Sequence, residues 1–430
     1  MRIAIAGDGV AGLHLALRLR QLGVEATLFG ARSPEDVRRG RALNFVARSG
    51  STRRREALLG VDFWTAPDTL AETRTVTVHG PEPLSFRADP HPAYSMVDFR
   101  LYLPALVEEY VARGGRHVVT ELTARTVRGL ADDHDLVVVA GGRAAGELFP
   151  RDPRCSPFDT PQRVLCGGLY RGIAEDVPRS IEFHAVPGVG EVLRMPFVCA
   201  DGRVDVLGLE AVPGGPLEAV CRTPYDRDPD RFHAAVLGAL RRHVPGLRER
   251  IDEREFRLNG PGDLVQGGVV PVVRRAWRPL ADGVWAFALG DAWCVNDPIT
   301  AQGANLASYC ALEFAEEVAA GPPFDEAFCR AAEERMRPYA ESVAQWTAAF
   351  VRPPAPHLLE LFRAAAADPA VAAAFAANFD DPPAMWRSIA TPERTAAFLD
   401  GVRGRSAAPA SGAPSERRGS PWAGLPARPL

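Results

Sequence analysis

The sequence predicts an α/β protein with two lobes, and three features of the chain predict it. Residues 1–29 pass from an apolar strand through a glycine turn and an amphipathic helix to a second strand, which makes one βαβ unit. Residues 162–258 instead hold alternating strand-like segments around one helix. The chain has 430 residues, more than the roughly 250 to 300 at which one core stops growing. We therefore expect a Rossmann-type lobe, a β-rich lobe and C-terminal helices.

The composition limits the classes of function. Hydrophobic residues make up 47% of the chain and charged residues 24%, as in ordinary globular proteins. The net charge of −4 predicts neither nucleic acid nor an anionic membrane as a partner. No lysine occurs, which excludes a P-loop lysine and a Schiff-base lysine. Seven scattered cysteines, no metal-type histidine pair, no signal-peptide pattern and no long apolar run predict a cytoplasmic protein without a metal site.

The N-terminal glycines predict a dinucleotide site. Gly7, Gly9 and Gly12 form GxGxxG directly after a strand and at the start of a helix. These positions serve a tight turn, close approach of the backbone to a pyrophosphate, and helix packing on the strand. The acidic residue that usually binds the ribose is absent, because Gly30 stands at the end of the second strand. A plain NAD dehydrogenase is therefore disfavoured.

A second stretch, "GDAWCVNDPITAQGANLASY" at 290–309, predicts the other half of a cofactor site. Asp291 follows an apolar strand, where its carboxylate can accept hydrogen bonds from ribityl or ribose hydroxyls. Beyond Pro298, residues 302–305 open a helix whose free N–H groups can face the edge of a flavin ring. Together with GxGxxG, this stretch indicates FAD extended across one lobe.

Several stretches carry a resemblance to a known family. They are "GDGVAGLHLALRLRQ", "RALNFVA", "VDFRLYLPALV", "DLVVVAGG", "QGGVVPVVR", "GDAWCVNDPITAQGANLASY" and "NFDDPPAMWRSIATPER". The chain resembles, over about residues 1–402, the two-component flavoprotein monooxygenases of the styrene and indole monooxygenase family. That family has the fold of para-hydroxybenzoate hydroxylase. The resemblance implies an FAD-binding domain at 1–73, 97–155 and 260–320, a substrate-binding lobe at 74–96 and 156–259, and a C-terminal helical region at 321–402. The final residues, 403–430, are rich in Pro, Gly, Ser and Arg, and this composition predicts a disordered tail.

The resemblance also implies the roles of individual residues. Asn44 matches the family's active-site asparagine, and Pro298 matches the proline beside the flavin ring. Substrate-pocket positions are Val46, Arg48 and Trp293. The residues expected to contact FAD are Gly7, Gly9, Gly12, Arg41, Arg100, Asp291, Gln302, Gly303, Ala304 and Asn305.

Some positions depart from the family pattern. Ala301 stands where the family usually has glycine, and a methyl group there can shift the loop. Arg48 stands where close relatives carry histidine, and Trp293 and Cys294 replace smaller or polar residues. These changes lie near the expected pocket, so the substrate need not be styrene. His14, just after the glycine loop, is predicted to be a packed polar residue and not a catalytic base.

The implied activity is epoxidation. Single-component hydroxylases of this fold carry an Asp-Gly motif after the strand that here reads "DLVVVAGG", and this chain has Gly141 and Gly142 without it. The resemblance therefore implies reduced FAD delivered by a separate reductase, which alone uses NAD(P)H. Oxygen then adds at flavin C4a, and the peroxyflavin epoxidises a vinyl arene, an indole or a similar hydrophobic alkene. A homodimer is left open.

Other readings stay open at this point. The enzyme alternative is a single-component NAD(P)H-dependent flavin hydroxylase, distinguished by whether NAD(P)H alone reduces bound FAD. A halogenase is disfavoured because it needs a lysine near the peroxide channel. A non-enzymatic carrier with the same fold, as in guanine-nucleotide dissociation inhibitors, would bind no reduced FAD.

Overall fold

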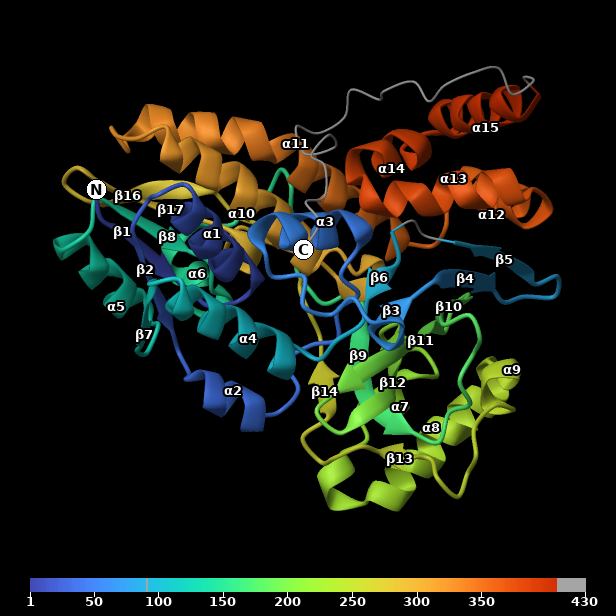
Figure 1. Ribbon diagram of the computed structural model, residues 1–430. Coiled ribbons are helices and arrows are strands. Elements are labelled where there is room, and N and C mark those ends of the chain that lie inside the picture. Colours follow the sequence, from blue (N-terminus) through green and yellow to red (C-terminus); the bar gives the residue numbers. More distant parts are fainter. Residues whose placement is uncertain (90–91, 408–430) are drawn as a thin grey trace.

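The computed structural model describes residues 1–89 and 92–407 (Figure 1). The first lobe is built on a six-stranded sheet in the order β16-β17-β8-β1-β2-β7. All neighbouring strands are parallel except β16, which runs antiparallel to β17 at one edge. The strand bounds are Ile3–Ala6 (β1), Ala26–Gly30 (β2), Arg116–Val119 (β7), Leu136–Val139 (β8), Trp277–Ala281 (β16) and Val284–Ala288 (β17).

The order of these strands brings distant parts of the chain together. Strand β1 lies between β2 and β8, and β8 lies against β17, so the glycine loop and the 290–309 stretch follow strands of one sheet. Strands β1 and β8 are fully buried and β17 is buried over its last three residues, because helices cover the sheet. The helices of this lobe are α1 (Val10–Gln21), α2 (Pro34–Arg39), α3 (Gly50–Leu59), α4 (Phe99–Ala112), α5 (Ala124–Gly129), α6 (Gly142–Leu148) and α10 (Gly303–Ala319).

The second lobe is an eight-stranded, mainly antiparallel sheet. Its order is β13-β9-β12-β11-β10-β4-β5, with β14 also paired to β9. The bounds are Thr73–Val78 (β4), Leu84–Ala88 (β5), Val164–Arg171 (β9), Ser180–Val186 (β10), Gly190–Cys199 (β11), Gly202–Ala211 (β12), Arg257–Leu258 (β13) and Leu264–Gly267 (β14). One face buries an apolar cluster under the helices α7 (Glu218–Cys221), α8 (Pro229–His243) and α9 (Pro245–Arg248).

The C-terminal helices extend from the first lobe to the β5 edge of the second sheet. In Figure 1 α11 lies along α10, whereas α12 to α15 lie across the second sheet from α8 and α9, with α12 and α13 packed on β5. Their bounds are Glu326–Phe350 (α11), Pro356–Ala367 (α12), Pro369–Ala377 (α13), Pro382–Ile389 (α14) and Pro392–Ala407 (α15). There are also two small two-stranded sheets outside the two main ones. One pairs β3 (Leu70–Ala71) with β6 (Tyr94–Ser95), and the other pairs β15 (Val272–Val273) with β18 (Cys294–Val295).

Two of the expected boundaries differ from the structure. Residues 264–267, expected in the FAD-binding domain, form β14 and pair with β9 of the second sheet, because the chain crosses the lobe junction there. The tail was expected to begin at 403, but α15 continues to Ala407. The rest of that expected tail, 408–430, lies outside the described residues.

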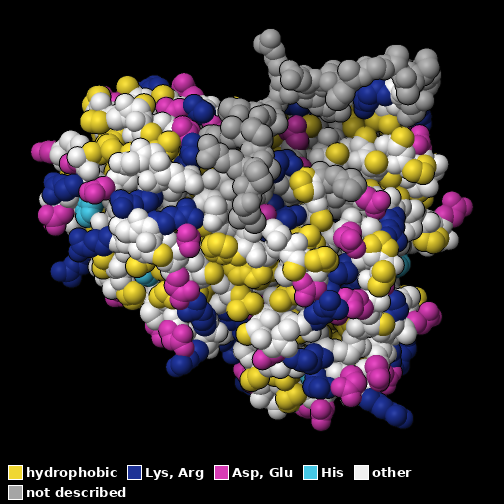
Figure 2. All heavy atoms as spheres, viewed as in Figure 1, with side chains coloured by type: hydrophobic (Ala, Val, Ile, Leu, Met, Phe, Trp, Pro, Cys, Tyr) yellow, Lys and Arg dark blue, Asp and Glu magenta, His cyan; other side chains and the backbone are white. Residues whose placement is uncertain are grey.

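Charges of both signs cover the surface, and the cysteines form no disulfide among the described residues. Figure 2 shows arginine and acidic side chains interspersed over one face. All seven cysteines are free thiols, six of them buried. Within 1–89 and 92–407 no three His, Cys, Asp or Glu side chains are placed to hold a metal ion. None of the helices described in that part of the chain has the length and apolar character needed to cross a membrane.

Candidate active site

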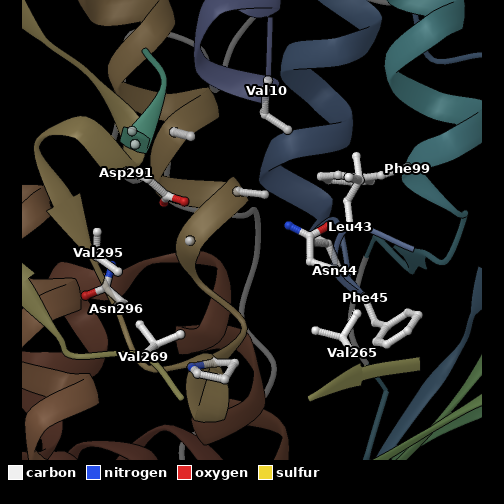
Figure 3. Close-up of a pocket in the computed structure, with 18 of the residues that line it drawn as sticks. Val10, Leu43, Asn44, Phe45, Phe99, Val265, Val269, Asp291, Val295 and Asn296 are labelled. Atoms are coloured by element: carbon white, nitrogen blue, oxygen red, sulfur yellow. The ribbon is translucent and has the colours of Figure 1, made fainter. Parts of the chain in front are cut away.

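A cavity of about 590 Å³ lies where the two lobes meet. It is lined by the loop after β1, by residues 43–46, by the segment after β17 and by the face of the second sheet opposite α8. Figure 3 shows Leu43 and Asn44 on one side of the cavity, facing Asp291, Val295 and Asn296 on the other. The structure thus joins the two halves of the predicted cofactor site in one space.

The glycine loop has the geometry that its motif predicts. Gly7 has φ of +126°, and a Cβ there would lie 2.5 Å from the backbone N of Gly141. A Cβ on Gly12 would lie 1.8 Å from the carbonyl oxygen of Gly7, so helix and strand pack too closely for any side chain. Gly9 is the N-cap of α1, and no side chain caps that helix. The backbone N–H groups at the start of α1 are therefore left to face the cavity, which Gly7 and Gly9 line.

A second helix also begins at this cavity. Gln302 is the N-cap of α10 and makes no side-chain cap, while Gly303 and Ala304 line the cavity. A Cβ on Gly303 would meet no atom within 4 Å, so the backbone there is open to a ligand. The first turn of α10 carries no acidic residue, so no side-chain charge there offsets the partial positive charge of the helix N-terminus. Two helix N-termini thus converge on one space.

The charges around the cavity come from carboxyl groups only. Asp8, Glu210, Asp291 and Asp297 line it, and no Arg or His side chain among the described ones does. Asp291 follows β17, and its deep position in the protein raises its pKa, an effect that the charge of Arg274 opposes. The N-terminus of α1, which lines the cavity through Gly9 and Val10, can supply positive potential to a bound phosphate.

Two arginines expected to contact FAD are placed elsewhere. Arg100 forms ion pairs with Asp98 at 2.5 Å and with Asp263 at 2.6 Å, and these two carboxylates hold its guanidinium away from the cavity. Arg41 is exposed and does not line the cavity. The structure therefore does not bring Arg41 and Arg100 to the wall of this cavity, and their contact with FAD stays a prediction.

Gln302 and Asn305, also expected at the flavin ring, do not line the cavity either. Asn305 is 1% exposed, and its Oδ1 accepts hydrogen bonds from the backbone N of Ser49 at 3.0 Å and from Thr52 Oγ1 at 2.8 Å. Gln302 is also buried, and its Nε2 donates to backbone carbonyls. Their side chains are engaged in holding the loop and α3, so only the backbone of this segment faces the cavity.

The expected catalytic and pocket residues divide into two groups. Asn44, Val46 and Pro298 line the cavity. Arg48 does not, because it is buried in an ion pair with Glu56 at 3.0 Å. Trp293 is 1% exposed and belongs to the core of the first lobe. The expectation that Arg48 and Trp293 form pocket walls is therefore corrected.

The floor of the cavity on the second sheet contains a pair of glycines that the sequence analysis missed. Gly167 on β9 pairs with Gly208 on β12, which also pairs with Leu193 on β11. A Cβ on Gly208 would meet no atom closer than 3.7 Å, whereas a Cβ on Gly167 would lie 3.3 Å from the ring of Phe45. Glycine inside a strand weakens it and often marks close approach of a ligand. Because successive residues of a strand face opposite sides of the sheet, the positions of Gly167 in "VLCGGLYR" and of Gly208 in "VDVLGLEA" could have placed the two glycines on the same face.

Glu210 was also missed, although it is a charged residue inside an apolar strand. It lines the cavity from β12, is 6% exposed, and its Oε2 has no hydrogen-bond partner among the described residues. Burial raises the pKa of Glu210 well above its ordinary value, and the neighbouring carboxylates Asp297 and Glu191 raise it further. Burial thus favours the protonated form of Glu210, in which the carboxyl group can donate a hydrogen bond into the cavity.

Comparison with known proteins relates the whole chain to one family. The family model described as "Styrene monooxygenase A putative substrate binding domain" matches residues 141–250, which include β9 to β12. The chain is 37% identical over 399 residues to "Styrene monooxygenase StyA" from Pseudomonas sp., covering 91% of this chain and 96% of that relative. It is 36% identical over the same length to the protein of that name from Pseudomonas fluorescens, with the same coverage.

Solved structures with this fold are flavoenzymes. The flavin-dependent brominase Bmp2 superimposes with a TM-score of 0.64 at 15% identity, over 94% of this chain and 99% of that one. A flavoprotein/dehydrogenase from Cytophaga hutchinsonii gives a TM-score of 0.66 at 12% identity, over 94% and 100%. The tetrameric 2-methyl-3-hydroxypyridine-5-carboxylic acid oxygenase gives 0.57 at 20%, over 89% and 96%. At these identities the likeness concerns the fold alone, and it confirms the expected para-hydroxybenzoate-hydroxylase-like architecture.

Proposed function

The chain belongs to the styrene monooxygenase family, and from this premise we propose that it epoxidises a small aromatic alkene with reduced FAD supplied by a separate reductase. It is a flavoprotein monooxygenase. The observation that carries the proposal is the convergence of two uncapped helix N-termini, α1 and α10, on a cavity whose floor is the apolar face of the second sheet.

The residues around the cavity fit FAD. Gly7, Gly9 and the start of α1 would hold the pyrophosphate through backbone N–H groups. Asp291 would accept hydrogen bonds from the ribityl hydroxyls, because its carboxylate opens onto the cavity and makes no hydrogen bond within the described part of the chain. The flavin ring would lie beside Pro298 and the first turn of α10.

The chemistry of oxygen belongs to the cofactor: reduced FAD supplies the electron pair that activates O2 for transfer of one oxygen atom. The chain's own residues position the reactants. The N–H groups at the start of α10 stabilise negative charge on the reduced ring without a charged side chain. The apolar side chains of β9, β11 and β12 exclude water and hold an arene, and Asn44 presents an amide at the opposite wall.

A substrate near Asn44 and Glu210 would meet hydrogen-bonding groups of both kinds. The Asn44 amide can donate and accept, and Glu210, whose pKa burial raises, can donate in its protonated form. A vinyl arene needs neither, whereas an indole N–H or a thioether sulfur has a polar atom to orient. The cavity is therefore compatible with vinyl arenes, indoles and sulfides, and the assay below ranks them.

Delivery of reduced FAD by a partner is supported by the end of β8. There Gly141 and Gly142 lead directly into α6, and the Asp-Gly motif that single-component hydroxylases carry after this strand is absent at this place. The remaining alternative is a single-component enzyme that takes hydride from NAD(P)H itself.

One experiment tests the proposal against that alternative. The purified protein is mixed with oxidised FAD and NADH or NADPH, with and without an added flavin reductase, in the presence of styrene, indole or a thioether. We expect product only in the reactions that contain the reductase. Product formed with NAD(P)H and no reductase would support the single-component alternative. A protein that forms no product with chemically reduced FAD and O2 would contradict both.

A further inference from the structure

The end of β2 raises a question of cofactor recognition. Dinucleotide-binding lobes commonly place an acidic residue there to bind the ribose hydroxyls. This chain has Gly30 at that position, followed by Ala31, so neither residue can serve. A cofactor that carries an adenosine would lose two hydrogen bonds unless another group replaces that acid.

The structure places a carboxylate in the vacated space. A Cβ added to Gly30 would lie 1.9 Å from Oδ2 of Asp8 and 2.7 Å from Nε2 of His117. Asp8 is the second residue of the GxGxxG motif and comes from the loop after β1. Its side chain therefore occupies the volume that a side chain at Gly30 would need, and glycine at position 30 is what admits it.

Asp8 is held in place and still open to a ligand. His117 on β7 lies with Nε2 3.2 Å from Asp8 Oδ2, and its own side chain is 7% exposed. Asp8 is 23% exposed and lines the cavity together with Ala31, while its Oδ1 has no hydrogen-bond partner among the described residues. A carboxylate with a free oxygen, next to the helix end that would take the pyrophosphate, is suited to accept hydrogen bonds from vicinal hydroxyls.

We propose that Asp8 binds the adenosine ribose hydroxyls of FAD in place of the missing acid at the end of β2, and that His117 is the positioning residue that orients its carboxylate. The proposal rests on the proposed function, because it requires FAD in the cavity. It adds a cofactor subsite formed by Asp8, from the loop after β1, and His117, from β7, the two strands that flank β2 in the sheet.

Equilibrium binding of two flavins tests the proposal without any turnover. Dissociation constants are measured by flavin fluorescence for FAD, and for FMN, which lacks the adenosine. We expect Asp8→Asn, which keeps the size of the side chain but removes its charge, to weaken FAD binding about tenfold or more. FMN binding should stay within about twofold, because the ring end of the cavity is unchanged.

His117 is tested by the same readout. His117→Leu should weaken FAD binding and leave FMN binding unchanged, and His117→Gln, which keeps a donor, should restore most of the FAD affinity. Adding His117→Leu to Asp8→Asn should cause little further loss, because both act through one carboxylate. A thermal unfolding scan of each variant without flavin checks that the fold persists.

The possible results separate this proposal from the proposed function. Equal loss of FAD and FMN affinity in Asp8→Asn would show that Asp8 only supports the loop and would overturn the proposal. Unchanged FAD affinity would overturn it as well, as would a wild-type protein that binds FMN as tightly as FAD. A wild-type protein that binds neither flavin, oxidised or reduced, would instead contradict the proposed function itself.

Discussion

The side-chain amide of Asn305 donates a 2.9 Å hydrogen bond to the carbonyl oxygen of Ala301, the residue whose backbone turns into the left-handed region at φ of +53°. Ala301 lines the cavity, just before the start of α10. The strained turn that precedes α10 is thus fixed by a buried side chain on the first turn of the same helix.

This contact predicts the effect of removing the amide. Asn305→Leu would leave the backbone N of Ser49 and the hydroxyl of Thr52 without their acceptor in a buried place. We expect the free energy of unfolding to fall by about 2–4 kcal/mol, measured by urea titration. FAD affinity should fall too, although the side chain does not line the cavity, because the start of α10 loses its anchor.

Ala301→Gly is the matched variant at the other end of this contact. Glycine relieves the left-handed strain but adds freedom to the unfolded chain, so the free energy of unfolding should change by less than about 1 kcal/mol. FAD affinity should stay near that of the wild type. A large change in Ala301→Gly, or none in Asn305→Leu, would contradict the role given to this hydrogen bond.

Asn44 is predicted to act in coupling oxygen use to product. Asn44→Ala removes an amide at the cavity wall without touching the helix ends, so FAD affinity should stay within about twofold. The ratio of epoxide formed to O2 consumed should fall, with hydrogen peroxide making up the difference. Asn296→Ala, on the opposite wall, is the control. Normal product yield in Asn44→Ala would count against the role.

The paired glycines predict the size of the substrate. Gly208→Val adds three carbons to the floor, at a strand position where valine is favoured and no atom blocks its Cβ within 3.7 Å. We expect kcat/KM for 2-vinylnaphthalene to fall about tenfold or more relative to that for styrene. Gly238→Ala on α8, away from the cavity, should leave the ratio unchanged. An equal fall of kcat/KM for both substrates in Gly208→Val would contradict the idea that the two floor glycines make room for large rings.

His14 predicts a pH dependence of stability. It is fully buried, with hydrogen bonds to Ser308 Oγ at 3.0 Å and to the Tyr102 hydroxyl at 2.7 Å. Burial, with the charges of Arg55 and Arg48, lowers the pKa of His14 from 6.5 to about 3. The unfolded chain therefore binds a proton that the folded one rejects, so stability is complete above pH 6.5 and is lost as the pH falls toward 3.

The matched variant for this pH dependence is His14→Gln, which does not titrate. Its amide can donate one hydrogen bond and accept another, so it can replace the bonds of His14 to Ser308 and Tyr102. Between about pH 7.5 and 5.5 the wild type should lose about 1.4 kcal/mol more stability than His14→Gln. Urea titrations at the two pH values measure the difference. The same pH dependence in both proteins would mean that His14 is protonated in the folded state.

Much of the fold follows from local sequence patterns. The glycine motif after an apolar strand predicted β1, α1 and β2. The apolar spacing in "VDFRLYLPALVEEYVARGG" is likewise typical of a helix, here α4, and Gly114 just beyond its end has φ of +81°. These features depend on neighbours in sequence, which a pattern can report. Residues 264–267 join the other lobe because their pairing partner lies about one hundred positions away on β9.

The sequence predicted where the site lies, but it predicted less well which side chains line it. Backbone features, such as the glycine loop and the start of α10, lie at the cavity as expected. Arg48 and Arg100 do not, because each has a carboxylate partner that only tertiary packing brings near, Glu56 for one and Asp263 for the other. The floor glycines and Glu210 were missed because a residue's face in a strand has meaning only once the register of the sheet is known.

The central claim is that one extended flavin dinucleotide occupies the cavity, and a crystal structure of the protein with FAD tests it most directly. We predict density for the diphosphate at Gly7 and Gly9 and for the ring system beside Pro298 and Gly303. Density for FAD at any other place on the protein, or the opposite orientation in this cavity, would contradict it.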